Sequence, residues 1–124
     1  MKVSAFVAFA SLLVAGLSLA GCGSDEDEDE GTATGSKCPD DSTLTYDNFG
    51  QEFFQSHCLS CHGASGPQSP KFDTLAQVRA NAARIDSVAA AGPNGVNTFM
   101  PKTGSVDTAD REKLGEWLAC GAPE

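Results

Sequence analysis

The feature that most constrains this chain is the pentapeptide Cys58-Leu59-Ser60-Cys61-His62, two cysteines three positions apart with a histidine directly after the second. This spacing is the pattern by which a c-type haem is attached covalently. The two thiols would add to the two vinyl groups of a haem, and His62 would bind the iron from one side. The same residues also admit a thioredoxin-like redox dithiol or a zinc site, so the rest of the sequence has to decide.

Neither of the two other chemistries finds support outside the pentapeptide. A thioredoxin-like pair requires a β-α-β pattern around the cysteines, and the sequence shows none. A zinc site would need a further ligand, His57 or Cys38, at a spacing that suits no common zinc module. One covalently attached haem c, with its iron, is therefore the predicted cofactor.

The N-terminus has the layout of an export signal. A short positive start, Met1-Lys2, precedes an apolar run over residues 3–20, and Leu19-Ala20-Gly21-Cys22 resembles the bacterial lipobox. The sequence thus predicts a lipoprotein signal peptide over residues 1–21 and lipidation of Cys22. A retained transmembrane helix is the alternative, because about 18 apolar residues is the lower limit for spanning a bilayer. We expect the protein in the bacterial cell envelope, lipid-anchored to a membrane and facing the periplasm or the cell exterior.

The segment after the lipidated cysteine has the composition of a tether. Residues 22–37 contain Gly, Ser, Thr, Ala and acidic residues without apolar periodicity, which predicts a flexible acidic linker before a folded domain over residues 38–124. The run Asp25-Glu26-Asp27-Glu28-Asp29-Glu30 supplies six of the nine net negative charges. Since no basic surface is indicated, nucleic acid is not an expected partner.

The folded part shows three helical patterns and no convincing strand. The first begins near Thr45, a capping residue, and leads into Cys58; the second covers about 74–90, and the last runs from near Asp107 to Gly121. The fold class predicted is all-α, with about three main helices around one haem.

An electron-transfer haem needs a second axial ligand, and Met paired with His is a known cytochrome arrangement. Met100 is the one methionine left after signal removal, and it lies in a loop before Pro101. A lone Met often only fills a gap in a core, but the missing ligand favours Met100 as the distal one. Lys71 and Lys102 are secondary candidates. His57 is tied to the attachment segment and cannot reach the other haem face.

These residues together resemble the single-haem class I cytochrome c family over about residues 45–121. The resemblance rests on the Cys58-to-His62 motif with Gly63, on Gly50 and Phe54 before it, on Leu114 and Trp117 in the last helix, and on Met100-Pro101. It implies that the small Gly50 lets the terminal helices approach closely and that a proline carbonyl, of Pro67 or Pro70, contacts the proximal histidine. If those helices pack as in the family, Cys38 and Cys120 come close and form a disulfide in an oxidising compartment.

The function expected is transfer of one electron at a time between extracytoplasmic redox partner proteins. The alternative is a haem-containing oxidoreductase, or a haem subunit, with an open or labile sixth site. No acid–base constellation supports an enzyme, so an electron carrier is favoured. The basic docking face of mitochondrial relatives is absent, and the acidic domain predicts a basic or polar surface on the partner.

Overall fold

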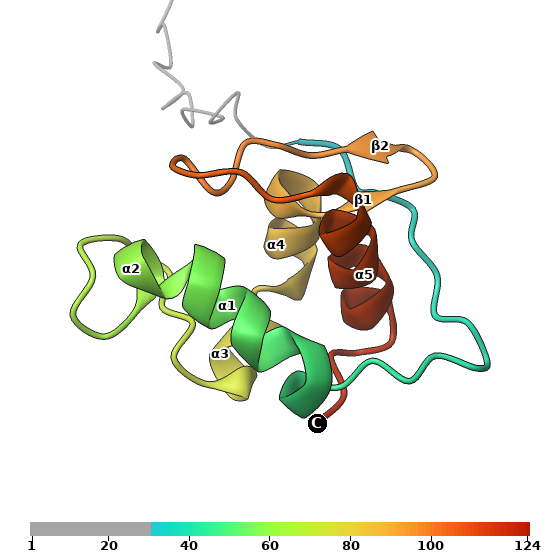
Figure 1. Cartoon of the computed structure of the whole chain (residues 1–124), viewed down its shortest axis with the longest axis horizontal. Coiled ribbons are helices and arrows are strands. Elements are labelled where there is room, and N and C mark those ends of the chain that lie inside the picture. The colour runs from blue at the N-terminus through green and yellow to red at the C-terminus, as the bar shows by residue number, and fades with distance from the viewer. Residues whose placement is uncertain (1–30) are drawn as a thin grey trace, which may run out of the picture.

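The computed structural model describes residues 31–124, so the expected signal peptide, Cys22 and the acidic run lie outside the described residues. The elements in chain order are the π-helical turn η1 (Tyr46–Gly50), α1 (Gln51–His57), α2 (Leu59–His62), α3 (Leu75–Ala80), α4 (Ala82–Ala89), β1 (Ala91–Gly92), β2 (Gly95–Val96) and α5 (Thr108–Ala119) (Figure 1). Within residues 31–124, no helix combines the length and the apolar character that a bilayer crossing requires.

The first helical segment begins where the sequence predicts. The Thr45 side chain accepts a hydrogen bond from the Asn48 amide, and the Asn48 side chain accepts one from the Thr45 amide. This reciprocal capping box satisfies amides that the first turn leaves free. The segment starts as the π-helical η1, continues as α1 and is interrupted at Cys58, after which α2 adds one more turn.

The second predicted helix is divided in two. Thr74 and Gln77 form a capping box at the start of α3. The chain leaves helical geometry at Asn81, whose side-chain amide donates to the Gln77 carbonyl at 2.8 Å. A side chain that bonds to the preceding turn competes with helix continuation, and α4 starts afresh at Ala82.

A small sheet follows α4, where the sequence predicts only a loop. β1 and β2 pair antiparallel, with Ala91 opposite Val96 and Gly92 opposite Gly95. Each strand has two residues, which is too short for the alternation that reveals strands in a sequence. The described part of the chain is thus mostly helical with one short hairpin, rather than purely helical.

The predicted linker over residues 22–37 needs correction at its C-terminal end. Residues 31–36, here called the strap, pack against α4 and the hairpin. Thr34 is 1% exposed, and its amide and hydroxyl both donate to the Asp86 carboxylate at 2.8 and 2.6 Å. The Asn97 side chain adds a bond to the Thr32 carbonyl. A polar, Gly-rich composition suggests a linker, but here the strap is held by hydrogen bonds rather than by apolar burial.

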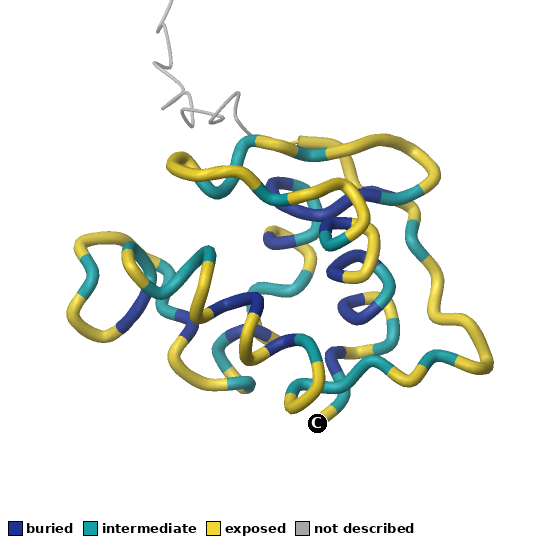
Figure 2. Tube along the Cα trace, in the orientation of Figure 1, coloured by how far each residue is buried: buried dark blue, intermediate teal, exposed yellow. Residues whose placement is uncertain are grey.

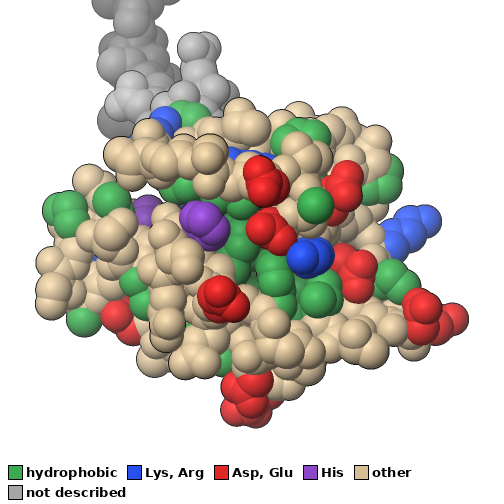
Figure 3. Space-filling view, in the orientation of Figure 1, with side chains coloured by type: hydrophobic (Ala, Val, Ile, Leu, Met, Phe, Trp, Pro, Cys, Tyr) green, Lys and Arg blue, Asp and Glu red, His purple; other side chains and the backbone are tan. Residues whose placement is uncertain are grey.

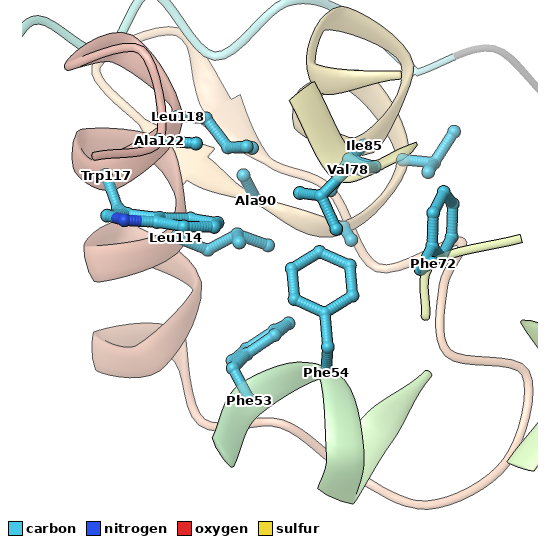
Figure 4. Packing of buried hydrophobic residues seen from close by; sticks show 12 residues of the cluster. Phe53, Phe54, Phe72, Val78, Ile85, Ala90, Leu114, Trp117, Leu118 and Ala122 are labelled. Atoms are coloured by element: carbon cyan, nitrogen blue, oxygen red, sulfur yellow. The ribbon is translucent and has the colours of Figure 1, made fainter. Parts of the chain in front are cut away.

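The core lies between α1, α3, α4 and α5. The largest fully buried side chains include Trp117, Phe54 and Leu114, and Figure 4 shows Phe53 and Phe54 of α1 directed toward the α5 side chains. Figure 2 shows the buried residues on the inward sides of these helices. Trp117 Nε1 donates to the Pro123 carbonyl at 3.1 Å, and the Tyr46 amide donates to the same oxygen at 2.8 Å.

A disulfide joins the two ends of this arrangement. Cys38 lies between the strap and η1, Cys120 follows α5, and their sulfurs are bonded to each other. The bond links residues separated by 82 positions. It therefore fixes the segment between the strap and η1 to the end of α5.

Candidate functional site

The candidate site is an apolar cavity of about 330 Å³, at the low end of the size range of small-molecule and cofactor sites. Its walls come from α1, α2, α4 and the two loops that follow α2 and β2. The apolar side chains that line it include those of Phe53, Phe54, Phe72, Ile85, Val88 and Phe99. The cavity also contains the sulfurs and nitrogens that the sequence predicts as haem contacts.

Both cysteines of the motif line this cavity as free thiols. Residues Cys58 and Cys61 are half-buried, and the Cys61 amide donates to the Cys58 carbonyl at 3.1 Å. Residues three apart on a helical turn lie on the same face, so this local turn presents both sulfurs to one space. Burial raises the pKa of the Cys58 thiol to about 12, which reflects how apolar this wall is.

His62 is oriented by a backbone carbonyl. Its Nδ1 lies 2.7 Å from the Pro70 oxygen. A carbonyl only accepts hydrogen bonds, so Nδ1 carries the proton and Nε2 keeps the lone pair that a metal requires. Of the two prolines that the resemblance leaves open, the structure thus places Pro70, not Pro67, against the histidine. The Phe72 ring packs beside the imidazole, with ring centres 5.0 Å apart.

Lys71 stabilises the loop between His62 and Pro70 by hydrogen bonds to two of its carbonyls. Lys71 Nζ donates to the Gly63 carbonyl at 2.9 Å and to the Gly66 carbonyl at 2.7 Å. The Asp73 carboxylate accepts a further bond from the Ala64 amide at 2.7 Å. Lys71 is not among the residues that line the cavity, so it supports the loop and does not stand as a ligand candidate.

Met100 reaches the same cavity from a different part of the chain. It is half-buried, and its amide donates to the Val88 carbonyl of α4 at 2.8 Å. The other candidate from this loop, Lys102, also lines the cavity, but its ammonium lies 2.9 Å from the centre of the Phe99 ring. This cation–π contact gives the charged form of Lys102 a partner other than a metal.

Arg111 is a residue of this region that the sequence pattern does not single out. It lies on α5, is 5% exposed, and its Nη1 is within 2.8 Å of the carbonyls of Ala89, Asn97 and Met100. Charged residues are rarely buried, but a single Arg in an amphipathic helix resembles a surface residue. The one available signal is its place one turn before Leu114, on the buried face.

The donors in the cavity fit a c-type haem. Two free thiols on one turn, an imidazole with Nε2 available and a thioether are the groups that attach and ligate such a haem. The zinc alternative loses one of its possible ligands, because Cys38 is bonded to Cys120. Among the described residues, no three His, Cys, Asp or Glu side chains are placed to hold a metal ion.

His57 also lines the cavity, and its imidazole packs against the Phe53 ring, with ring centres 5.1 Å apart.

The space-filling view shows the surroundings of this site. Histidine side chains reach the surface beside hydrophobic ones, and several acidic side chains lie on the same face of the molecule (Figure 3). The charged residues that line the cavity itself, Arg84 and Lys102, are basic.

Comparison with known protein families gives one match. The family model described as cytochrome C oxidase, cbb3-type, subunit III matches residues 48–118, which is more than half of the chain and includes the motif, the Met100 loop and most of α5. Neither the curated proteins nor the solved structures contain a match to the chain. The matched residues carry the cysteines, the histidine and the helices that form the cavity, and the chain therefore belongs to this family of haem-containing, electron-transferring c-type cytochromes.

Proposed function

We propose that this protein is a lipid-anchored cytochrome with one haem c that carries one electron at a time between extracytoplasmic redox partners. The observation that carries the proposal is that one apolar cavity brings together both motif cysteines, His62 and Met100. These groups come from two segments about 40 residues apart in the chain, and the family match covers both.

Each side chain has a separate role in this proposal. The thiols of Cys58 and Cys61 hold the haem covalently, and His62 Nε2 and Met100 Sδ ligate its iron. When bound, the haem supplies an iron that cycles between its ferrous and ferric states. The chain keeps both ligands in place: the Pro70 carbonyl fixes the imidazole tautomer, and the Val88 carbonyl holds the Met100 backbone. Fixed ligands and an apolar cavity reduce the rearrangement that accompanies each electron transfer.

A pyridine haemochrome spectrum of the purified, matured protein tests the covalent haem directly. A Met-to-iron charge-transfer band in the ferric spectrum then tests Met100. We expect Met100→Ala to abolish this band and to open the iron to carbon monoxide, while His57→Ala keeps the band. A wild-type protein that is already high-spin and binds carbon monoxide readily would instead support the oxidoreductase with an open sixth site.

The anchor and the partner belong to the same proposal. Lipidation of Cys22 would hold the domain at a membrane of the cell envelope, and Cys22→Ser is expected to release it into a soluble fraction. The chain is acidic, with a formal net charge of −9, and several acidic side chains lie on one face of the molecule (Figure 3). A partner with a basic or polar docking surface would associate more slowly as salt is added; an association rate that is independent of salt would argue against it.

A further inference from the structure

Arg111 connects the last helix to the segment that carries Met100. Its Nη1 lies 2.6 Å from the Ala89 carbonyl, 2.8 Å from the Asn97 carbonyl and 2.8 Å from the Met100 carbonyl. Its Nε contacts the Val106 carbonyl at 3.4 Å. One guanidinium thus joins the end of α4 to three points of the loop over residues 97–106.

The Met100 backbone has few other attachments besides its contact with Arg111. The loop between β2 and α5 contains no helix or strand, so its own backbone pattern does not hold it. Outside the guanidinium, the Met100 backbone has one bond, from its amide to Val88. The planar, multi-donor head of arginine suits several carbonyls at once, whereas the ammonium of a lysine is a point charge with a different geometry.

The charge of Arg111 is not neutralised by a partner. Its hydrogen-bond acceptors, the carbonyls of Ala89, Asn97, Met100 and Val106, are all uncharged. Within residues 31–124, no carboxylate lies at ion-pair distance from it. The side chain is 5% exposed, so water screens the charge only weakly. Because the guanidinium contacts the Met100 carbonyl at 2.8 Å, its positive charge lies beside the segment that carries Met100 and disfavours gain of further positive charge there.

We propose that Arg111 is a positioning residue for the distal ligand, and that its buried positive charge raises the reduction potential of the haem. The inference rests on the proposed function, in which Met100 ligates the iron. The guanidinium holds the Met100 carbonyl and so keeps the thioether directed at the iron. The ferric iron carries one more positive charge than the ferrous iron, so a nearby uncompensated cation favours the reduced form.

Two substitutions of Arg111 separate the positioning of Met100 from the effect of the positive charge. Arg111→Lys keeps the positive charge but loses the planar guanidinium with its several N–H donors. Arg111→Gln loses both the charge and the guanidinium. The matched control is Arg79→Gln, because Arg79 is an exposed arginine that donates to one backbone carbonyl, that of Ala122, and does not line the cavity. All proteins are matured with haem, and each is examined by its ferric spectrum, by imidazole titration and by potentiometry.

For the positioning role, imidazole should displace Met100 more easily in both Arg111 variants. Both variants weaken the contact with the Met100 carbonyl, so Met100 competes less well with imidazole for the iron. The loss of about one hydrogen bond corresponds to roughly tenfold tighter apparent imidazole binding. For the charge, Arg111→Gln should lower the reduction potential, measured while the Met-to-iron band is intact, and Arg111→Lys should leave it near the wild-type value. Arg79→Gln should change neither property.

Several results would overturn the proposal. Unchanged imidazole affinity in both Arg111 variants rejects the positioning role, and an unchanged potential in Arg111→Gln with an intact band rejects the role of the charge. If neither variant yields haem protein while Arg79→Gln does, Arg111 serves folding as a whole and the specific role is wrong. A wild-type spectrum without the Met-to-iron band is a different result, because it refutes the proposed function itself.

Discussion

The backbone of Gly50 lies against the indole ring of Trp117. A Cβ at Gly50 would be 2.7 Å from Cζ2 and 2.8 Å from Cη2 of that ring. Trp117 is fully buried, and its ring also packs against Tyr46 with centres 6.3 Å apart. The missing side chain at Gly50 is what allows the first helical segment and α5 to cross this closely.

Gly50→Ala should therefore destabilise the fold. The added methyl group cannot be accommodated by a flexible side chain, because the indole is held on all sides, and overpacking of this kind costs about 1–3 kcal/mol. Thermal or urea unfolding of the haem protein measures the change. Gln55→Ala, an exposed position on α1, is the control and should stay within about 0.5 kcal/mol of wild type. Equal stability of both variants would show that the helix crossing tolerates a wider spacing.

The contact between Gly50 and Trp117 illustrates what the sequence can reveal. Capping residues such as Thr45 and Thr74 act on their own helix, so they mark its start in any context. The close crossing of the terminal helices was predicted from the family resemblance at Gly50 and Trp117. Met100 was predicted as a ligand because it is the one methionine left after signal removal. Local chemistry and a short list of special residues therefore identified the sulfur and nitrogen donors in the cavity, but not most of its apolar wall.

What the sequence did not reveal depends on contacts between distant segments. The strap carries no apolar pattern, and its order comes from Asp86, which lies 52 residues from Thr34. Arg111 resembles a surface residue until the carbonyls around it are known. The choice of Pro70 over Pro67 depends on how the loop folds back on His62. In each case the deciding partner is a backbone group or a remote side chain, which local periodicity does not encode.

The disulfide between Cys38 and Cys120 should make a large contribution to stability. Closing a loop of 82 residues restricts the unfolded chain by about 4–5 kcal/mol on the chain-entropy model. We expect the double variant Cys38→Ser/Cys120→Ser to lose a similar amount in urea unfolding. Dithiothreitol should lower the unfolding midpoint of the wild type toward that of the variant and leave the variant unchanged. Detection of two free thiols in the untreated wild type would contradict the bond.

Lys71 should stabilise the loop on the His62 side of the cavity. Lys71→Met removes the donor shared by the Gly63 and Gly66 carbonyls. Hydrogen bonds to charged groups contribute about 1.5–3 kcal/mol each, and the half-buried position of Lys71 reduces this through solvent screening. We therefore expect a loss of about 1–2 kcal/mol in thermal unfolding of the haem protein.

The control for Lys71 is Lys113→Met. Lys113 is exposed and forms one surface ion pair with Asp110 at 3.0 Å, so its loss should have little effect on unfolding. If the two lysine variants unfold at the same temperature, the carbonyl contacts of Lys71 do not contribute measurably to stability.

The strap should be released when Asp86 is removed. The Asp86 carboxylate accepts both the amide and the hydroxyl of Thr34, and the exposed Lys37 directly after the strap offers a site for trypsin. When opening is fast relative to cleavage, the rate of cleavage follows the population of the open state. Loss of two bonds to a charged group should raise that population by about tenfold or more. Asp86→Ala should therefore be cut after Lys37 at least about tenfold faster than wild type, as followed by mass spectrometry.

Asp73→Ala provides the matched comparison, because Asp73 also accepts a backbone amide, that of Ala64, but in the loop next to His62. It should leave cleavage after Lys37 at the wild-type rate, since that loop does not contact the strap through any bond in residues 31–124. Cleavage at the same rate in Asp86→Ala and wild type would mean that the strap is held by its contacts with the hairpin and with Asn97. The main attachment of the strap would then be the hydrogen bond that the Asn94 amide donates to the Thr34 carbonyl.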